Sequence, residues 1–415
     1  MIRILSSYNK IYSSLKKNNS QTNRPHRLIN NLSTIEMERC LVSSTHTPLR
    51  FSQIPRSISL FNCPKLTLPS SSFAIPHLRR GFRDGFCKTL SFNSMLTRTL
   101  CTKAVLSEIP NQKKYSKVAA ESTGPISSNQ LLGVVETAAK TGAEVVMDAV
   151  NKPQNIVYKG LTDLVTDTDK MGEVAILEVV TKNFKDHLIL GEEGGLIGDS
   201  SSDYLWCIDP LDGTTNFAHC YPSFAVSVGV LYKGKPAAGA VVEFVGGPMC
   251  WNTRTFSAAA GGGAFCNGQK IQVSHTDKVE QSLLVTGFGY EHDDAWSTNI
   301  ELFKEFTDVS RGVRRLGAAA VDMCHVALGI VEAYWEYRLK PWDMAAGVLM
   351  VEEAGGVVSC MDDGKYSVFD RSVLVSNGVL HDKLLERIGP PTDKLKNKGI
   401  DFSLWFKPEN YHTDC

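Results

Sequence analysis

The sequence of 415 residues lacks any hydrophobic run long enough to cross a bilayer, which takes about 20 consecutive apolar residues. It also lacks a Cys-x-x-Cys pair, although it holds 11 cysteines, four of them before residue 104. Neither a zinc site nor a disulfide framework is therefore expected. These absences exclude a membrane-spanning protein and a small disulfide-stapled module. They leave a globular chain, long enough for one large or two ordinary domains, that keeps its thiols reduced.

Acidic residues are scarce in residues 1–103, which hold 16 Lys or Arg but only three acids, Glu36, Glu38 and Asp84. This part is rich in Ser, Asn and Pro, so it predicts a disordered organellar transit peptide with a linker. A basic nucleic-acid-binding arm is the alternative. It fits less well because the basic residues are scattered, and no nucleic-acid partner is expected. The length favours import into the chloroplast stroma, whereas the opening Met-Ile-Arg-Ile-Leu would suit a mitochondrion.

Hydrophobic periodicity predicts that the folded part begins with a long helix capped by Ser127 or Ser128. Up to about residue 280 the pattern is rich in strands, including residues 204–208 and 249–255. From residue 281 strands alternate with helices, and one strand is expected at residues 313–316. The sequence thus predicts an α+β first half and an α/β second half that share one site at their junction.

The most informative stretch is Asp209-Pro-Leu-Asp-Gly-Thr-Thr-Asn216. Asp209 ends a short apolar segment typical of a buried strand, and Pro210 is expected to stop that strand because it has no N–H to donate. Gly213 permits a tight turn, and the following Thr and Asn residues favour a helix start. Carboxylates hold Mg²⁺, and exposed helix amides bind phosphate. An ordinary Asx-turn is the simpler alternative, but the whole run predicts hydrolysis of a phosphate ester.

This stretch resembles the signature of the inositol monophosphatase family of Mg²⁺-dependent, lithium-sensitive phosphatases. Further stretches resemble the same family: Leu164-Val-Thr166 with Asp169, Gly191-Glu-Glu193, Trp342-Asp343, and Glu353-Ala-Gly-Gly356. The resemblance covers about residues 127–388 as the phosphatase domain and leaves residues 390–415 as a tail. It implies a homodimer and a layered αβαβα sandwich of the inositol monophosphatase and fructose-1,6-bisphosphatase type.

The resemblance also implies roles for individual residues. The implied ligands of two Mg²⁺ ions are Glu192, Asp209, the Leu211 carbonyl, Asp212 and Asp343. The implied catalytic residues are Asp169 and Thr214, which would align the attacking water, and Glu193, a supporting acid. The implied substrate-binding residues are Glu192, Asp212, Gly213, Thr214, Thr215, Gly317, Ala319, Glu336 and Asp343. Lys159 is left out, because its spacing looks one residue shorter than in relatives, and Ala318 replaces a common Ser or Thr.

The implied reaction is Mg²⁺-dependent hydrolysis of myo-inositol monophosphate, a small phosphorylated polyol, by activated water. L-Galactose 1-phosphate is expected as a second substrate, because it also offers a ring hydroxyl beside the ester. The alternatives are a phosphatase for histidinol phosphate or another small phosphomonoester, and a non-catalytic binding or structural member. The presence of every implied metal ligand disfavours the non-catalytic alternative, and the sequence leaves the substrate open.

Overall fold

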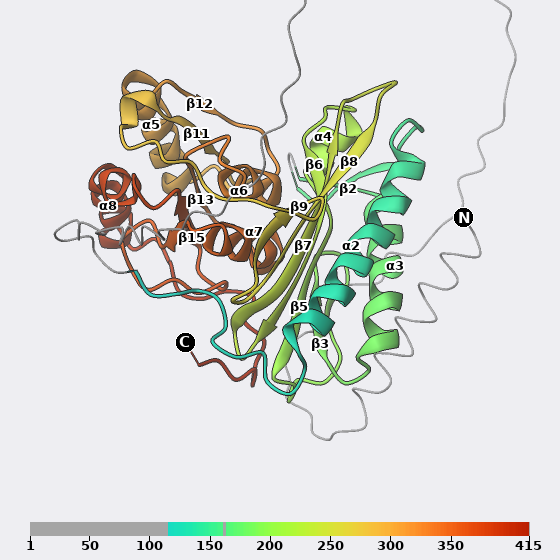
Figure 1. Ribbon diagram of the computed structural model, residues 1–415. Helices are drawn as coiled ribbons and strands as arrows, with labels where there is room; N and C mark the ends of the chain where they lie inside the picture. The colour runs from blue at the N-terminus through green and yellow to red at the C-terminus, as the bar shows by residue number, and fades with distance from the viewer. Residues whose placement is uncertain (1–114, 161–162, 415) are drawn as a thin grey trace, which may run out of the picture. The chain divides into compact units, whose positions relative to one another are not determined.

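The computed structural model describes residues 115–160 and 163–414. The predicted transit peptide at residues 1–103 lies outside the described residues. The described elements alternate in layers: a helix pair, an eight-stranded sheet, a second helix pair, a five-stranded sheet, and an outer helix pair (Figure 1). This arrangement confirms the layered αβαβα sandwich that the sequence predicts.

The first helical layer packs on the eight-stranded sheet. This layer and its connection contain α2 (Ser128–Ala149), β1 (Ile156–Tyr158), β2 (Leu164–Thr166) and α3 (Asp167–Asn183). The long first helix starts as predicted, because the Ser127 side chain accepts a hydrogen bond from the Gln130 N–H at 3.3 Å. Leu131 and Val135 on its apolar face are completely buried against the sheet, and this burial holds the helix in place.

The eight-stranded sheet has the order β10-β9-β8-β7-β6-β5-β3-β4, and only β3 and β5 pair in parallel. Its strands are β3 (Leu188–Gly191), β4 (Gly195–Ile197), β5 (Tyr204–Asp212), β6 (Phe224–Tyr232), β7 (Lys235–Val245), β8 (Asn252–Ala259), β9 (Gly263–Cys266) and β10 (Gln269–Lys270). The prediction that Pro210 stops β5 is wrong, because the strand continues to Asp212. The register with β6 shifts between Asp209 and Asp212, so the ladder requires no N–H from Pro210.

The inner helices lie between the two sheets. They are α6 (Ala319–Ala327) and α7 (Pro341–Glu353). The second of them approaches β6 and β7 closely where these strands carry glycine. A Cβ at Gly229 would lie 2.8 Å from the Ala345 Cβ, and one at Gly239 would lie 2.8 Å from the Ala346 Cα. This close approach fixes the start of α7, and with it Asp343, relative to the first sheet.

The five-stranded sheet has the order β12-β11-β13-β15-β14. Its strands, the preceding 3₁₀ turn and the outer helices are η1 (Val279–Gln281), β11 (Leu283–Thr286), α5 (Asp294–Val309), β12 (Gly312–Arg314), β13 (Ala333–Tyr337), β14 (Val357–Ser359), β15 (Ser372–Ser376) and α8 (His381–Asn397). The predicted domain end near residue 388 falls within α8, which continues through Pro390 and Pro391. The Thr392 hydroxyl donates to the Ile388 carbonyl at 2.8 Å, and Leu395 is buried, so packing carries the helix past the prolines.

Two predicted strands have different limits in the structure. The strand predicted at residues 249–255 is β8, which starts later because Met249 has a φ of 72° in the preceding turn. The strand predicted at residues 313–316 is β12, which ends at Arg314. Gly317, with a φ of 83°, then turns the chain toward α6. Left-handed backbone does not fit a strand, so Met249 cannot begin β8, and Gly317 lies in the turn beyond the end of β12.

The described N-terminal segment packs on the body of the fold. The backbone N–H groups of Val118 and Ala119 donate to the Glu352 carboxylate at 3.0 and 2.6 Å. The Ala120 N–H donates to the Pro236 carbonyl at 2.8 Å, so this segment joins α7 to the start of β7. None of the described helices is both long and apolar enough to span a membrane. The cysteines that the structure describes are unpaired, as the sequence predicts.

Candidate active site

An open cleft of about 110 Å³ lies where the ends of β3, β5 and β13 meet the starts of α6 and α7. Most of the predicted site residues line it: Glu192, Asp209, Leu211, Asp212, Gly213, Thr214, Gly317, Ala319, Glu336 and Asp343. Asp169 and Glu193 lie just outside it, and Thr215 lines an adjoining hollow beside Arg315. Segments far apart in the sequence therefore converge on one cleft.

The two aspartates of β5 are buried. Asp209 Oδ1 accepts a hydrogen bond from the Leu211 N–H at 2.9 Å. The two oxygens of Asp212 accept from the N–H groups of Ala319 and Ala320 at 3.1 and 2.7 Å, which ties β5 to the start of α6. Burial, together with neighbouring acids, raises the pKa of Asp209 well above its usual range and that of Asp212 to about 8.

Asp343 lies in the first turn of α7, where a carboxylate is favoured by the helix dipole. Its Oδ2 accepts a hydrogen bond from the Lys340 N–H at 2.7 Å. Burial raises the pKa of this carboxyl group to about 6, and the positive charge of Lys340 opposes that rise. Asp343 therefore faces the cleft as a poorly neutralised acid.

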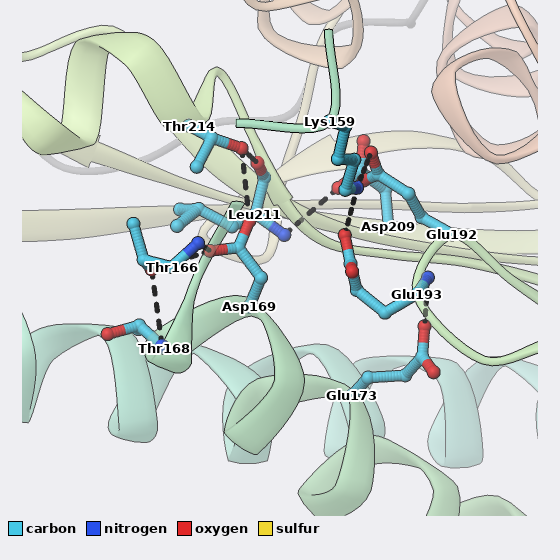
Figure 2. Close-up of polar contacts among 10 residues, drawn as sticks. All are labelled: Lys159, Thr166, Thr168, Asp169, Glu173, Glu192, Glu193, Asp209, Leu211 and Thr214. Carbon is cyan, nitrogen blue, oxygen red and sulfur yellow. Dashed lines mark hydrogen bonds and ion pairs between the residues drawn. The ribbon is translucent and has the colours of Figure 1, made fainter. Parts of the chain in front are cut away.

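Lys159 lies against the two acids of the loop after β3 (Figure 2). Its Nζ is 3.2 Å from Glu192 Oε1 and also contacts Glu193 Oε1. Burial alone would lower the pKa of Lys159, but the two acids raise it above its usual range. The sequence analysis left Lys159 out because of its spacing. The structure nevertheless places it beside both predicted acids.

Glu173, on α3, lies beneath the same loop and was missed by the sequence analysis (Figure 2). Its side chain is fully buried, and Oε2 accepts a hydrogen bond from the Glu193 N–H at 2.9 Å. Burial raises the pKa of Glu173 to about 8. A Cβ at Gly191 would lie 2.5 Å from Glu173 Oε2, so glycine at this position lets the loop rest on Glu173. An acid four residues after Asp169, among the apolar residues of α3, is the signal that could have identified it.

Asp169 and Thr214 connect α3 to the short helix α4 (Thr214–Ala218) (Figure 2). Asp169 Oδ2 accepts from the Thr166 N–H and hydroxyl at 2.8 and 2.6 Å, which caps α3. The Thr214 hydroxyl lies 3.0 Å from both Asp169 Oδ1 and the Leu211 carbonyl. Burial raises the pKa of Asp169 to about 7. One hydroxyl proton is thus shared between two acceptors at the edge of the cleft.

Glu336 is the last residue but one of β13 and lines the cleft. Its carboxylate is buried and accepts a hydrogen bond from the Tyr334 hydroxyl. Burial raises its pKa to about 7. Gly287 lies directly against this carboxylate and leaves no room for a Cβ. Glu336 is therefore held rigidly, with a carboxylate available to a bound molecule.

Oxygen donors dominate the cleft. No group of three His, Cys, Asp or Glu side chains among the described residues is positioned to hold a metal ion as it stands. The donor chemistry nevertheless fits a hard divalent cation: of the six carboxylates that line the cleft, the four expected to bind metal are those of Glu192, Asp209, Asp212 and Asp343, and the Leu211 carbonyl lies with them. Burial and mutual repulsion make the ionised acids unfavourable without positive charge. A bound cation would supply that charge.

Comparison with known proteins identifies the class to which this fold and cleft belong. The chain belongs to the inositol monophosphatase family, whose model matches residues 128–390. The match begins at the first residue of α2 and ends within α8. The chain is accordingly a phosphoric monoester hydrolase.

Individual relatives agree with this class. The chain is 73% identical over 378 residues to the protein named phosphatase IMPL1, chloroplastic, of Arabidopsis thaliana, covering 91% of this chain and 100% of that one. It is 37% identical over 258 residues to human inositol monophosphatase 1, covering 61% and 90%. The solved structure of inositol monophosphatase from Anabaena (Nostoc) matches with a TM-score of 0.56 and 39% identity, covering 62% of this chain and 94% of that one.

Proposed function

We propose that this enzyme hydrolyses myo-inositol monophosphate in a Mg²⁺-dependent reaction, with L-galactose 1-phosphate as a second substrate. The observation that carries the proposal is the convergence of four carboxylates, from β5, α7 and the loop after β3, on one cleft that also contains Thr214. Two of the relatives are themselves named inositol monophosphatases.

The residues that would hold Mg²⁺ are Glu192, Asp209, the Leu211 carbonyl, Asp212 and Asp343. Bound Mg²⁺ supplies positive charge at the phosphate and lowers the pKa of a coordinated water. Lys159 already neutralises part of the charge of Glu192 and Glu193. We infer that Lys159 orients Glu192 toward the cleft rather than replacing the metal.

The remaining residues act on water and substrate. Thr214 Oγ1 would take up the proton of the attacking water as its own hydroxyl proton passes to Asp169 Oδ1, 3.0 Å away. The backbone amides at the start of α4 would hold phosphate oxygens. Glu336 would accept a hydrogen bond from a ring hydroxyl beside the ester, which favours a polyol as the alcohol part of the substrate.

Phosphate release tests this proposal. The chain from residue 104 onward, supplied with inositol 1-phosphate, L-galactose 1-phosphate or histidinol phosphate, should act fastest on inositol 1-phosphate and only with Mg²⁺. Asp209→Asn should lower kcat by roughly 10³-fold, because it removes a charge from the centre of the donor set. Metal-independent turnover would refute the mechanism, and faster hydrolysis of histidinol phosphate would refute the substrate.

We also propose that the protein acts in the chloroplast. The basic, acid-poor residues 1–103 and the chloroplastic name of the Arabidopsis relative support this location. A fluorescent reporter fused after residue 105 should enter plastids and be shortened there. Mitochondrial import would exclude the plastid, and a full-length cytosolic reporter would exclude targeting altogether.

A further inference from the structure

We propose that the C-terminal segment, residues 399–414, positions residues 338–343, the wall of the cleft that carries Asp343. Trp405 is the central residue of this segment. This inference rests on the proposed function, in which Asp343 is a metal ligand. The segment lies after the part of the chain that matches the family, so the match assigns it no role.

Trp405 reaches the cleft wall directly. Its indole Nε1–H donates a hydrogen bond to the Leu339 carbonyl at 2.9 Å. Leu339 lines the cleft four residues before Asp343. The Trp405 backbone N–H donates to the Phe369 carbonyl at 3.0 Å, which fixes the base of the side chain. The indole therefore connects a buried part of the body to the wall of the site.

Arg371 reinforces the same connection. Its guanidinium lies 4.8 Å from the centre of the Trp405 ring, and its Nε donates to the Ser403 carbonyl at 2.9 Å. On the other side, the Arg371 carbonyl accepts a hydrogen bond from the Arg338 N–H at 2.5 Å. Arg338 also lines the cleft. One arginine thus joins the C-terminal segment to the residue just before Leu339.

Phe406 contacts the far end of the wall. Its ring meets that of Trp342 edge to face, with 5.0 Å between the ring centroids. Trp342 is 5% exposed and immediately precedes Asp343. The wall is therefore held at both ends, at Leu339 through a hydrogen bond and at Trp342 through an aromatic contact.

The wall needs such support because its backbone is unusual. Arg338 has a φ of 66°, a left-handed conformation that is unfavourable for a residue other than glycine. Its side chain contacts Asp293, and its backbone is held by Arg371. A segment in this conformation keeps its shape only when its surroundings enforce it, and the C-terminal segment provides part of those surroundings.

The alternative is that the C-terminal segment stabilises the whole fold without positioning Asp343. Tyr411, in the same segment, provides a matched control for this alternative. The Tyr411 hydroxyl lies 3.0 Å from the Gly234 N–H and 3.2 Å from the Asp203 carbonyl, at the turn between β6 and β7 and the start of β5. Neither residue lines the cleft. Tyr411→Phe therefore weakens the docking of the segment away from the site. Trp405→Phe keeps an aromatic ring near Arg371 and removes the donor to Leu339.

The experiment measures Mg²⁺ binding by titration calorimetry without substrate, together with Tm, kcat and KM, on the wild-type chain and both variants. Trp405→Phe should weaken Mg²⁺ binding about 10-fold, the lower end of the effect of substituting residues that support metal ligands. Tyr411→Phe should lower Tm and leave Mg²⁺ binding unchanged. Equal Mg²⁺ binding by wild type and Trp405→Phe, or an equal loss in both variants, would overturn the proposal.

Two further results keep the outcomes distinct. If Trp405→Phe does not fold, Phe406→Leu takes its place, and it should also weaken Mg²⁺ binding more than Tyr411→Phe does. Unchanged binding in that variant would equally overturn the positioning role. If the wild-type chain itself binds no Mg²⁺, the proposed function fails, and the inference about the C-terminal segment fails with it for that separate reason.

Discussion

The Thr214 hydroxyl lies 3.0 Å from Asp169 Oδ1, and this contact joins the first turn of α4 to the first turn of α3. Asp169 also caps α3 through Thr166, so its position is fixed by the helix it begins. The Thr214 hydroxyl is consequently oriented by an acid of α3. Thr214 is thus the residue whose substitution tests the orientation of water with the least disturbance to the fold.

Thr214→Ala should lower kcat by about 10²-fold, because it removes the group that would orient the attacking water. Thr214→Ser keeps the hydroxyl and should stay within a few-fold of wild type by the same reasoning. Steady-state kinetics at saturating Mg²⁺, with Tm measured in parallel, distinguishes this effect from a loss of stability. Equal activity in the two variants would show that the hydroxyl plays no part in the reaction.

Glu336→Gln should weaken the hydrolysis of polyol phosphates selectively. A lost hydrogen bond from a hydroxyl to a charged acceptor costs about 1.5–3 kcal/mol, or roughly 10- to 150-fold in kcat/KM. Hydrolysis of p-nitrophenyl phosphate, which has no neighbouring hydroxyl, should change little. Tyr334→Phe is the control for indirect effects on Glu336. It removes the Tyr334 hydroxyl that donates a hydrogen bond to Glu336, and Tyr334 does not line the cleft. A uniform loss on all substrates would contradict hydroxyl recognition.

Glu173→Ala should destabilise the loop after β3. It leaves the Glu193 N–H without its acceptor, at a cost of about 1–3 kcal/mol. Glu173→Gln should be much milder, because burial raises the pKa of Glu173 to about 8 and the side chain is therefore mostly uncharged at pH 7. Urea unfolding measures both, with Glu178→Gln on the exposed face of the same helix as the control. A glutamine variant as unstable as the alanine variant would contradict this account.

The folded state should lose stability as the pH falls from 6.5 to 4, partly because of His187. Its ring stacks between Phe184 and Tyr204, and Nδ1 accepts a hydrogen bond from Trp206 Nε1 at 3.0 Å. Burial lowers its pKa from 6.5 to about 4. In this window the unfolded chain therefore binds a proton that the folded chain does not, and acid favours unfolding.

Partial exposure of the ring to solvent limits this effect to about 1–2 kcal/mol. His187→Asn keeps a hydrogen-bond acceptor but does not titrate. Urea unfolding at pH 6.5 and pH 4.5 should therefore show a smaller difference in the variant than in the wild type. An identical difference would show that the acid sensitivity comes from other groups.

Sequence reasoning was strongest where the chemistry is carried by short motifs. Asp209, Asp212 and their neighbours could be placed at a strand end because local patterns of apolar and turn residues determine that position. The layered sandwich followed from the resemblance that these motifs carry. Local signals of this kind need no knowledge of the tertiary contacts.

Residues whose importance comes from tertiary contacts could not be found in this way. Glu173 is marked locally only as an acid among the apolar residues of α3, and nothing there shows that it supports a loop 20 positions away. Trp405 meets Leu339 66 positions away, and no local pattern connects the two. The run Pro390-Pro391 likewise predicts a helix end, which burial of the following turn overrides. Each of these misses reflects packing that a single sequence does not display.

If residues 1–103 direct import and are then removed, as proposed, the hydrogen bonds from Val118 and Ala119 to Glu352 bear on where the chain can be cut. A processing protease that cuts at or before residue 117 leaves both amide donors on the mature chain. A cut further downstream would leave the Glu352 carboxylate without them and free the link to β7. The folded body would thus set the last position at which the proposed presequence could be removed without losing these hydrogen bonds, and we expect the N-terminus of the mature chain to lie upstream of Val118.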